Sequence, residues 1–420
     1  MTPRTCLALL ACCCALAAFA QPRTPLLYLD LPFSQPLMRW ASDEAGQMHL
    51  LFQEGGDAVL YTLDPLTIEV AARRSFGGLP PAAQLLALTV QRDSCWIYHL
   101  GPEGTVQVQT LALQQRNPRL QALPEARLGG RSAYWGSFTY QGQLHVLRLL
   151  KGGNRVRICR FDRGSSFYIQ EYPVRQPQLL AGLEAGMQQI DLAAPPAMES
   201  SWRPSKVVLD GDQLRLCADG PDSVHLATID LNAGTLTESA YAMPLRGARS
   251  ASDLREGHLF LYSQTPDSVA VRGIDLLGGA EVLAWTWKPG DGAPVLLAAV
   301  AEDGTRQPAE QAAAWLRNST ALPHAAIAVQ PLEHGGWEIA AGGLDPLITT
   351  GLAGVVVDER YRLQVLRVRL PVAPQGEALA GSPRLGLEPR FRRGTVVMPA
   401  ARGSKRTGYF DPAQRTFVLY

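Results

Sequence analysis

Short stretches of alternating apolar and polar residues recur along the chain, and a glycine opens each of the clearest ones. Residues 211–216 and 257–262 both begin with glycine and then place two leucines at alternate positions. Strict alternation of this kind is typical of a half-buried β-strand. An aspartate follows each glycine at a nearly constant interval, which leaves room for two strands and a turn. The glycine and aspartate pairs are Gly46 and Asp64, Gly142 and Asp162, Gly211 and Asp230, and Gly257 and Asp275.

These glycines are separated by steps of 96, 69 and 46 residues. A further strand pattern, residues 94–98, lies midway in the first step, so the basic period is about 46 to 48 residues. A period of that size, written in short strands, is typical of the blades of a β-propeller. The sequence therefore predicts an all-β chain folded as a β-propeller of about seven blades, and six or eight blades also fit the pattern.

The repeated aspartates fit turns between strands. Residues 230–234 and 275–279 each begin with aspartate and end with glycine. An aspartate side chain accepts hydrogen bonds from the backbone two residues on, and glycine supplies the positive φ that closes a hairpin. We interpret these aspartates as turn residues used once per blade. The alternative is a catalytic or metal-binding role.

The repeat resembles that of β-propeller proteins as a group. Residues 230–234 are similar to the aspartate-to-glycine turn of quinoprotein blades, although Glu238 stands where those blades carry tryptophan. The paired glycines at 129–130 and 152–153 are not followed by tyrosine and tryptophan at the set intervals of kelch repeats. The chain contains no Trp-Asp dipeptide, and residues 42–46 do not form an Asp-box. The resemblance covers the architecture of most of the chain and points to no single family.

Two segments interrupt the period. Residues 176–202 add about 22 residues to one repeat, and the alanine-rich residues 300–345 contain a helical pattern that starts at Pro308 and covers 308–317. Strand patterns at 26–29 and 416–420 are expected to pair and close the ring, which hides two sheet edges. The alternative organisation is a pair of smaller β-domains divided near residue 200.

The N-terminal segment, residues 1–20, has the pattern of a signal peptide. A single arginine precedes a short apolar stretch, and residues 18–20 fit a small-x-small cleavage rule, so the mature chain is expected to begin at Gln21. Residues 21–420 then form a single propeller-like domain. A buried first helix and a lipoprotein anchored at Cys12 are the alternatives. No later segment reaches the 18 apolar residues that a membrane span needs.

Charge and cysteine content narrow the class of partner. The formal net charge is +1, which argues against a protein that binds polyanions such as nucleic acid. Three cysteines remain outside the signal, at 95, 159 and 217, and none belongs to a C-x-x-C motif. Each lies in an apolar run, so we expect them to be buried and to form no intramolecular disulfide.

No constellation in the sequence identifies a catalytic or metal site. The chain lacks G-x-S-x-G, H-E-x-x-H, a P-loop and G-x-G-x-x-G. His49 and His145 both stand three residues after their glycine, so a ring could bring them to a common channel and a metal. The alternative, which we favour, is a repeated strand residue with its polar tip at the surface. We assign no catalytic residue, no metal ligand and no cofactor.

Other polar and aromatic groups have structural explanations. Carboxylate pairs at 43–44, 210 with 212, and 358–359 lie next to turn signals. The stretch 390–406 carries six cations and no acid, and we interpret it as a solvated loop face. The aromatic residues at 134–135 and the pair Trp285 and Trp287 are expected to fill space between blades rather than to stack on a ligand.

A repeat architecture without a catalytic motif favours an exported binding or scaffold module of the periplasm or cell surface. Its partner would be a protein or a glycan, and the module itself is expected to be a monomer. The alternatives are a secreted hydrolase or lyase whose catalytic residues lie on loops at one mouth of the channel, and a purely structural envelope component. An aromatic or apolar patch at a mouth would favour binding, whereas clustered carboxylates and histidines would favour an enzyme.

Overall fold

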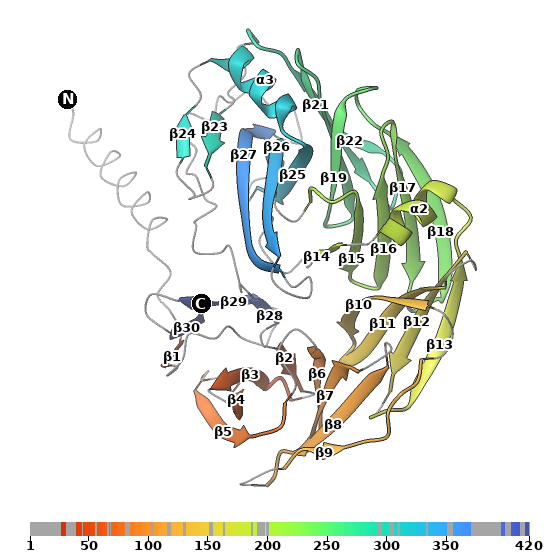
Figure 1. Ribbon diagram of the computed structural model, residues 1–420, viewed down its shortest axis with the longest axis vertical. Helices are drawn as coiled ribbons and strands as arrows, with labels where there is room; N and C mark the ends of the chain where they lie inside the picture. The colour runs from red at the N-terminus through yellow and green to blue at the C-terminus, as the bar shows by residue number, and fades with distance from the viewer. Residues whose placement is uncertain are drawn as a thin grey trace, which may run out of the picture.

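A computed structural model shows seven β-sheets arranged in a ring (Figure 1). Their strands pair antiparallel in the described residues, except for the parallel pair β14 (Gln188–Ile190) and β15 (Ser205–Asp210). It describes residues 27–30, 39–43, 45–54, 57–64, 67, 69–79, 85–101, 105–115, 119–128, 132–150, 154–162, 164–185, 188–190, 198, 201–291, 296–301, 306–308, 311–332, 335–350, 356–370, 396–399, 405–411 and 416–419. Within this part of the chain five sheets have four strands and two have five. The chain is therefore a β-propeller, and the prediction of about seven blades is confirmed.

The first five blades follow the chain from the inside of the ring outwards. Blade 1 contains β2 (Arg39–Ser42), β3 (Met48–Glu54), β4 (Asp57–Leu63) and β5 (Val70–Phe76). Blade 2 contains β6 (Leu85–Gln91), β7 (Ser94–Leu100), β8 (Val106–Ala112) and β9 (Gln121–Ala122). Blade 3 contains β10 (Ser132–Tyr140), β11 (Gln143–Leu150), β12 (Arg155–Phe161) and β13 (Phe167–Pro173). Blade 4 contains β14 (Gln188–Ile190), β15 (Ser205–Asp210), β16 (Gln213–Asp219), β17 (Ser223–Asp230) and β18 (Thr235–Ala242). Blade 5 contains β19 (Arg249–Arg255), β20 (His258–Gln264), β21 (Val269–Asp275) and β22 (Glu281–Trp287).

Blade 6 departs from this order. Its inner strands are β25 (His324–Pro331), β26 (Trp337–Thr350) and β27 (Val356–Leu370), but its outer strands, β23 (Leu296–Val300) and β24 (Arg306–Pro308), come earlier in the chain. The helix α3 (Ala312–Ala321) connects β24 to β25, a few residues after the helix predicted at 308–317. Residues 300–345 thus supply parts of this blade.

Blade 7 closes the ring with both ends of the described chain. It contains β28 (Val396–Pro399), β29 (Lys405–Asp411), β30 (Thr416–Leu419) and β1 (Leu27–Asp30). β30 pairs antiparallel with β1, from Leu27 opposite Leu419 to Asp30 opposite Thr416. The predicted pairing of the N-terminal and C-terminal strands is confirmed, and it leaves β30 bonded on both of its edges.

The sequence spacing follows from the hairpin geometry. In blade 5 the glycine lies in a two-residue hairpin, where Glu256 and Gly257 have φ of 47° and 77°, the positive values that a type I′ turn requires. The next residue, His258, lies opposite Asp275 across β20 and β21. Asp275 then accepts backbone hydrogen bonds from Leu277 (3.1 Å) and Gly278 (3.0 Å). The prediction of turn aspartates is confirmed for this repeat.

The hydrophobic core consists of separate layers between neighbouring blades. Most layers combine side chains from two adjacent sheets, such as Leu214 and Leu216 of blade 4 with Leu147 and Ile158 of blade 3. The helix α2 (Pro177–Ala185), in the predicted insertion 176–202, adds its own leucines to that layer. No helix in the described residues is long and apolar enough to cross a membrane.

The three cysteines belong to these layers. Cys95, Cys159 and Cys217 are free and fully buried, on β7, β12 and β16 of three different blades. Burial raises the pKa of the Cys159 thiol to about 11. The expected role as buried small hydrophobic residues is confirmed.

Candidate functional site

Strands β15, β19 and β25 of blades 4, 5 and 6 begin at the same face of the ring, and a group of polar and aromatic residues gathers there. Trp202 and Arg203 directly precede β15, Arg249 opens β19 and His324 opens β25. Met198 and Trp202, before blade 4, pack against the apolar layer of blade 6, where the amide of Ile327 donates a 2.9 Å hydrogen bond to the buried Ser201 hydroxyl. This crossing brings Trp202 next to β25.

We call this group the strand-start cluster, with the following members: Trp202, Arg203, Arg249, His324, Asp345 and Arg362. The rings of Trp202 and His324 lie 4.6 Å apart. The guanidinium carbon of Arg203 stands 5.3 Å from the centre of the Trp202 ring, within the range of a cation–π contact. The contacts therefore stack an arginine, an indole and an imidazole at one mouth of the ring.

The other arginines hold the edges of this cluster. Arg249 donates a hydrogen bond to the carbonyl oxygen of Leu322, and Arg362 forms an ion pair with Asp345. Arg203 and Arg249 are exposed, and the Arg362 side chain is 51 % exposed. Three guanidinium groups thus face solvent with one carboxylate among them.

Burial and the excess of positive charge in this cluster both lower the pKa of His324. Burial lowers the pKa of His324, the charge of Arg249 lowers it further, and Asp345 opposes both to a smaller degree. The imidazole therefore stands in a positive environment, which disfavours its protonation.

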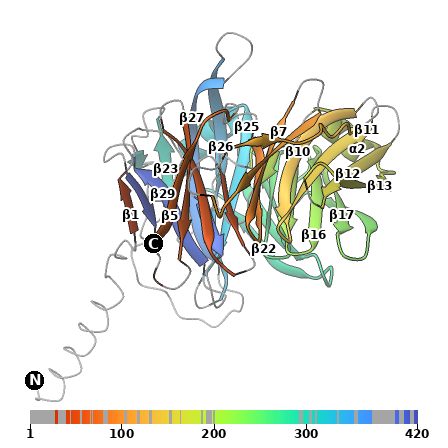
Figure 2. The same cartoon turned by 90° about the horizontal axis from the view of Figure 1, so that it is seen from below.

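A two-stranded ribbon rises from the same face, as Figure 2 shows for β26 and β27. β25 pairs with β26 only as far as Leu344, and β23 pairs with β27 only between Leu363 and Arg367. Beyond these points residues 345–350 pair with 356–362 alone, in the described part of the chain. Six strand residues span about 20 Å. Residues 346–357 contain no charged side chain.

A second polar group lies between blades 4 and 5 and is buried. The Lys206 ammonium contacts a carboxylate oxygen of Asp219 and donates to the Ser252 hydroxyl at 3.1 Å. Ser252 in turn donates to Asp219 through its hydroxyl (2.6 Å) and its amide (3.0 Å), and Cys217 lies 3.5 Å from the same hydroxyl. A serine beside a lysine is a combination that can perform nucleophilic catalysis.

This buried group is instead arranged as a structural connection. Lys206 and Ser252 are 0 % exposed, so no substrate reaches them in this conformation. Burial and the neighbouring Asp219 raise the pKa of the Cys217 thiol to about 12, so Cys217 stays a thiol at neutral pH. On the opposite face of β19, Asp253 accepts the amide of Val329 at 3.1 Å, and burial raises the pKa of its carboxyl. β19 is thus bonded to both neighbouring blades.

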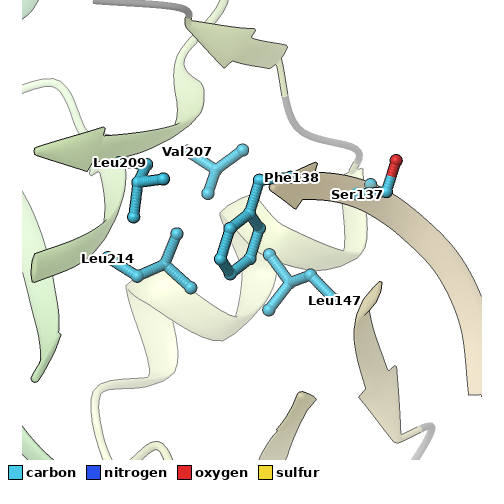
Figure 3. Close-up of a pocket in the computed structure, with 7 residues that line it drawn as sticks. Ser137, Phe138, Leu147, Val207, Leu209 and Leu214 are labelled. Atoms are coloured by element: carbon cyan, nitrogen blue, oxygen red, sulfur yellow. The ribbon is translucent and has the colours of Figure 1, made fainter. Parts of the chain in front are cut away.

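A small cavity between blades 3 and 4 is apolar (Figure 3). Phe138, Leu147, Val207, Leu209 and Leu214 surround it, and its volume of about 10 Å³ is close to the least that one water requires. It therefore has no room for a substrate or a cofactor.

The structure corrects the interpretation of the two repeated histidines. His49 and His145 are 1 % and 4 % exposed, so the prediction of a polar tip at the surface is wrong. His49 has polar partners at Thr62 (3.1 Å) and Asp43 (3.3 Å), and His145 contacts the carbonyl oxygen of Gln143 (3.1 Å). These contacts let an imidazole replace an apolar residue in the core. Among the described residues no group of three or more His, Cys, Asp or Glu could hold a metal ion.

The predicted carboxylate pairs form turns and connections. Asp43 accepts the amides of Ala45 (2.9 Å) and Gln47 (2.8 Å). Asp210 pairs with Arg215 and accepts the amide of Gly257 in the next blade. Asp212 accepts from the hydroxyl of Tyr140 of blade 3 at 2.6 Å. The side chains at 358–359 lie outside the described part.

The aromatic prediction is confirmed for Trp287, which is 3 % exposed, and Trp285 packs partly buried against the same core layer. The side chains at 134–135 and of the basic stretch 390–406 lie outside the described residues. The backbone of that stretch includes β28 and the first two residues of β29, so the prediction that it is a loop is wrong for these residues.

The strand-start cluster was not predicted from the sequence. Its members come from three blades and share no local motif. A weak signal existed, since each core member stands at or just before the start of β15, β19 or β25.

Comparison with known proteins identifies no family. No known protein family matches the chain, and no curated protein sequence matches it. Among solved structures, the WD40 domain of coronin from Toxoplasma gondii aligns with 11 % identity and a TM-score of 0.32, over 84 % of this chain and 88 % of that one. A protein from Lactobacillus plantarum aligns with 12 % identity and a TM-score of 0.30, over 80 % and 85 %. Hsv2 from Kluyveromyces lactis aligns with 9 % identity and a TM-score of 0.32, over 81 % and 100 %.

Proposed function

We propose that this chain is an exported binding or scaffold module of the bacterial periplasm or cell surface, with a protein or glycan partner. The observation that carries the proposal is the ribbon of β26 and β27, which stands clear of the ring on the face that holds the strand-start cluster. Within the described residues no further strand pairs with its outer edges; residues 346–350 of its first strand carry no charge, whereas Asp358 and Glu359 lie opposite Thr349 and Ile348 on its second strand. Features of this kind bind partners when they are exposed in a native protein.

Export is supported by the signal-peptide pattern of residues 1–20. We expect the full chain, expressed in a bacterial host with its own N-terminus, to appear outside the cytoplasm with Gln21 as its first residue. Mass spectrometry of the fractionated protein measures this. A cytoplasmic protein that keeps residues 1–20 contradicts export, and a lipid on Cys12 identifies the anchored alternative.

Binding is tested by shortening the ribbon. Replacing residues 347–360 by Asn-Gly retains Pro346 opposite Tyr361 and closes the hairpin with a type I′ turn. We expect chemical cross-linking to intact envelopes of the source bacterium to lose its main products in this variant. The matched control removes exposed apolar surface elsewhere, with Tyr168→Ser and Ile169→Ser on the edge strand β13. Unchanged products in the ribbon variant would mean that the ribbon is not the binding element.

A further inference from the structure

We propose that the strand-start cluster binds an anionic saccharide, that is, a sugar ring that carries a carboxylate or a phosphate. The inference rests on the proposed function, because it names a ligand for the face from which the ribbon rises. It adds a second contact surface, at the mouth of the ring, to the one that the ribbon provides.

The charge balance of the cluster favours an anion. Among the described residues of the cluster, three arginines accompany one carboxylate, Asp345, and that carboxylate is already paired with Arg362. Arg203 forms no ion pair within the described residues, whereas Arg155 and Arg157 on the outside of blade 3 share Glu171. The guanidinium of Arg203 is therefore available to a carboxylate or phosphate, which it matches with two parallel hydrogen bonds.

The position of Arg203 is also prepared before a ligand arrives. The side chain lies over the Trp202 ring, and Trp202 is held by His324 on β25 and by the apolar layer of blade 6. Arginine stacked on an aromatic ring loses less freedom when it binds. The residue before Trp202 is anchored by the hydrogen bond from the Ile327 amide to the Ser201 hydroxyl, which holds the indole next to β25.

The aromatic component indicates the rest of the ligand. A partly buried indole and an imidazole beside exposed arginines provide flat apolar surface next to positive charge. The C–H face of a sugar ring packs on such a surface while its acidic group reaches the arginines. A bare inorganic anion would use the arginines alone, so the aromatic contact separates the two kinds of ligand.

Titration calorimetry of the full mature chain tests the proposal with four probes: tetragalacturonate, glucose 6-phosphate, cellotetraose and inorganic phosphate. We expect binding of the carboxylate probe, the phosphate-ester probe or both, at least tenfold tighter than cellotetraose and inorganic phosphate. Whichever acidic probe binds more tightly identifies the anionic group. Failure of both acidic probes, or equal binding of cellotetraose or of inorganic phosphate, overturns the proposal.

Two variants locate the site. Arg203→Gln should weaken binding of the acidic probe at least tenfold and leave the melting temperature unchanged, because the side chain is exposed. Arg160→Gln is the matched control, since Arg160 is also exposed and lies 5.2 Å from the centre of the Tyr168 ring in blade 3. Equal weakening in both variants would overturn the assignment of the site.

The ribbon variant separates this proposal from the proposed function. Shortened between 347 and 360, the chain retains all six residues of the strand-start cluster and should bind the acidic probe as the parent does. Saccharide binding with unchanged cross-links supports the cluster and contradicts the ribbon. Lost cross-links without saccharide binding show the opposite.

Discussion

Imidazole side chains occupy core positions on two strands of this propeller, and burial of His145 lowers the folding stability at acidic pH. His145 stacks on Phe138, with ring centres 5.1 Å apart, and burial lowers its pKa to about 4. The unfolded chain binds a proton near pH 6.5, so it takes up that proton before the folded chain does. Folding stability therefore falls as the pH drops from about 6.5 to about 4.

His145→Phe removes this proton and retains a stacked ring. Between pH 7 and pH 4.5 we expect the variant to lose about 2 kcal/mol less free energy of unfolding than the parent, because each pKa unit corresponds to about 1.4 kcal/mol. Urea unfolding at the two pH values measures the difference. Equal losses in both proteins would show that the imidazole is protonated as readily in the folded state as in the unfolded one.

β19 is the element that joins three blades through buried polar contacts. Ser252 donates two hydrogen bonds to Asp219 of blade 4, and Asp253 accepts one from Val329 of blade 6. A buried carboxylate that loses a donor keeps the cost of its own desolvation. Removing a side-chain donor from β19 is therefore expected to destabilise the fold by more than the loss of one exposed hydrogen bond.

Ser252→Ala removes the hydroxyl that contacts both Asp219 and Lys206. We expect it to lower the free energy of unfolding by about 1–3 kcal/mol, since it leaves a buried ion pair with one partner fewer. Ser250→Ala is the control on the same strand, because the Ser250 hydroxyl is less buried and, within the described part of the chain, contacts the Ser263 hydroxyl alone, at 3.0 Å. If urea unfolding shows equal losses for the two variants, the contact with Asp219 does not connect the blades as described.

At the level of elements, repeated hairpins were predictable and the sixth blade was not. A glycine in the first turn and an aspartate in the next mark blades 1, 3, 4 and 5, because Gln213 lies opposite Asp230 in the same way that His258 lies opposite Asp275. β23 carries no such marks, and it ends at Val300, whereas its partner β27 begins only at Val356. Local patterns therefore cannot reveal that the outer edge of blade 6 precedes its inner strand.

The ring as a whole depends on β30, which is bonded to β1 on one side and to β29 on the other. Deleting residues 416–420 should open two sheet edges and cost several kcal/mol, a large share of the roughly 5–15 kcal/mol that stabilises a typical domain. We expect a lower melting temperature and aggregation in light scattering. A chain with an extra C-terminal tag after intact residues 416–420 is the control. A truncated chain that stays monomeric and melts like the control would contradict closure by this strand.

The candidate site is a property of the whole molecule, which explains why the sequence did not reveal it. Trp202, Arg249 and His324 lie in three different repeats and meet only because β15, β19 and β25 begin at one face. His49 and His145 show the converse case. They occupy equivalent places in their repeats, yet each is used within its own blade.

Blade 7 also determines when the ring can close during synthesis of the chain. β1 ends at Asp30, and its partner strand begins at Thr416. At roughly 5–20 residues per second, a ribosome needs about 20–80 seconds to make the intervening polypeptide. During all of that time the first strand has no partner and the ring has a gap. Closure of the ring therefore cannot occur until residues 416–419 have been synthesised, however early the other blades fold.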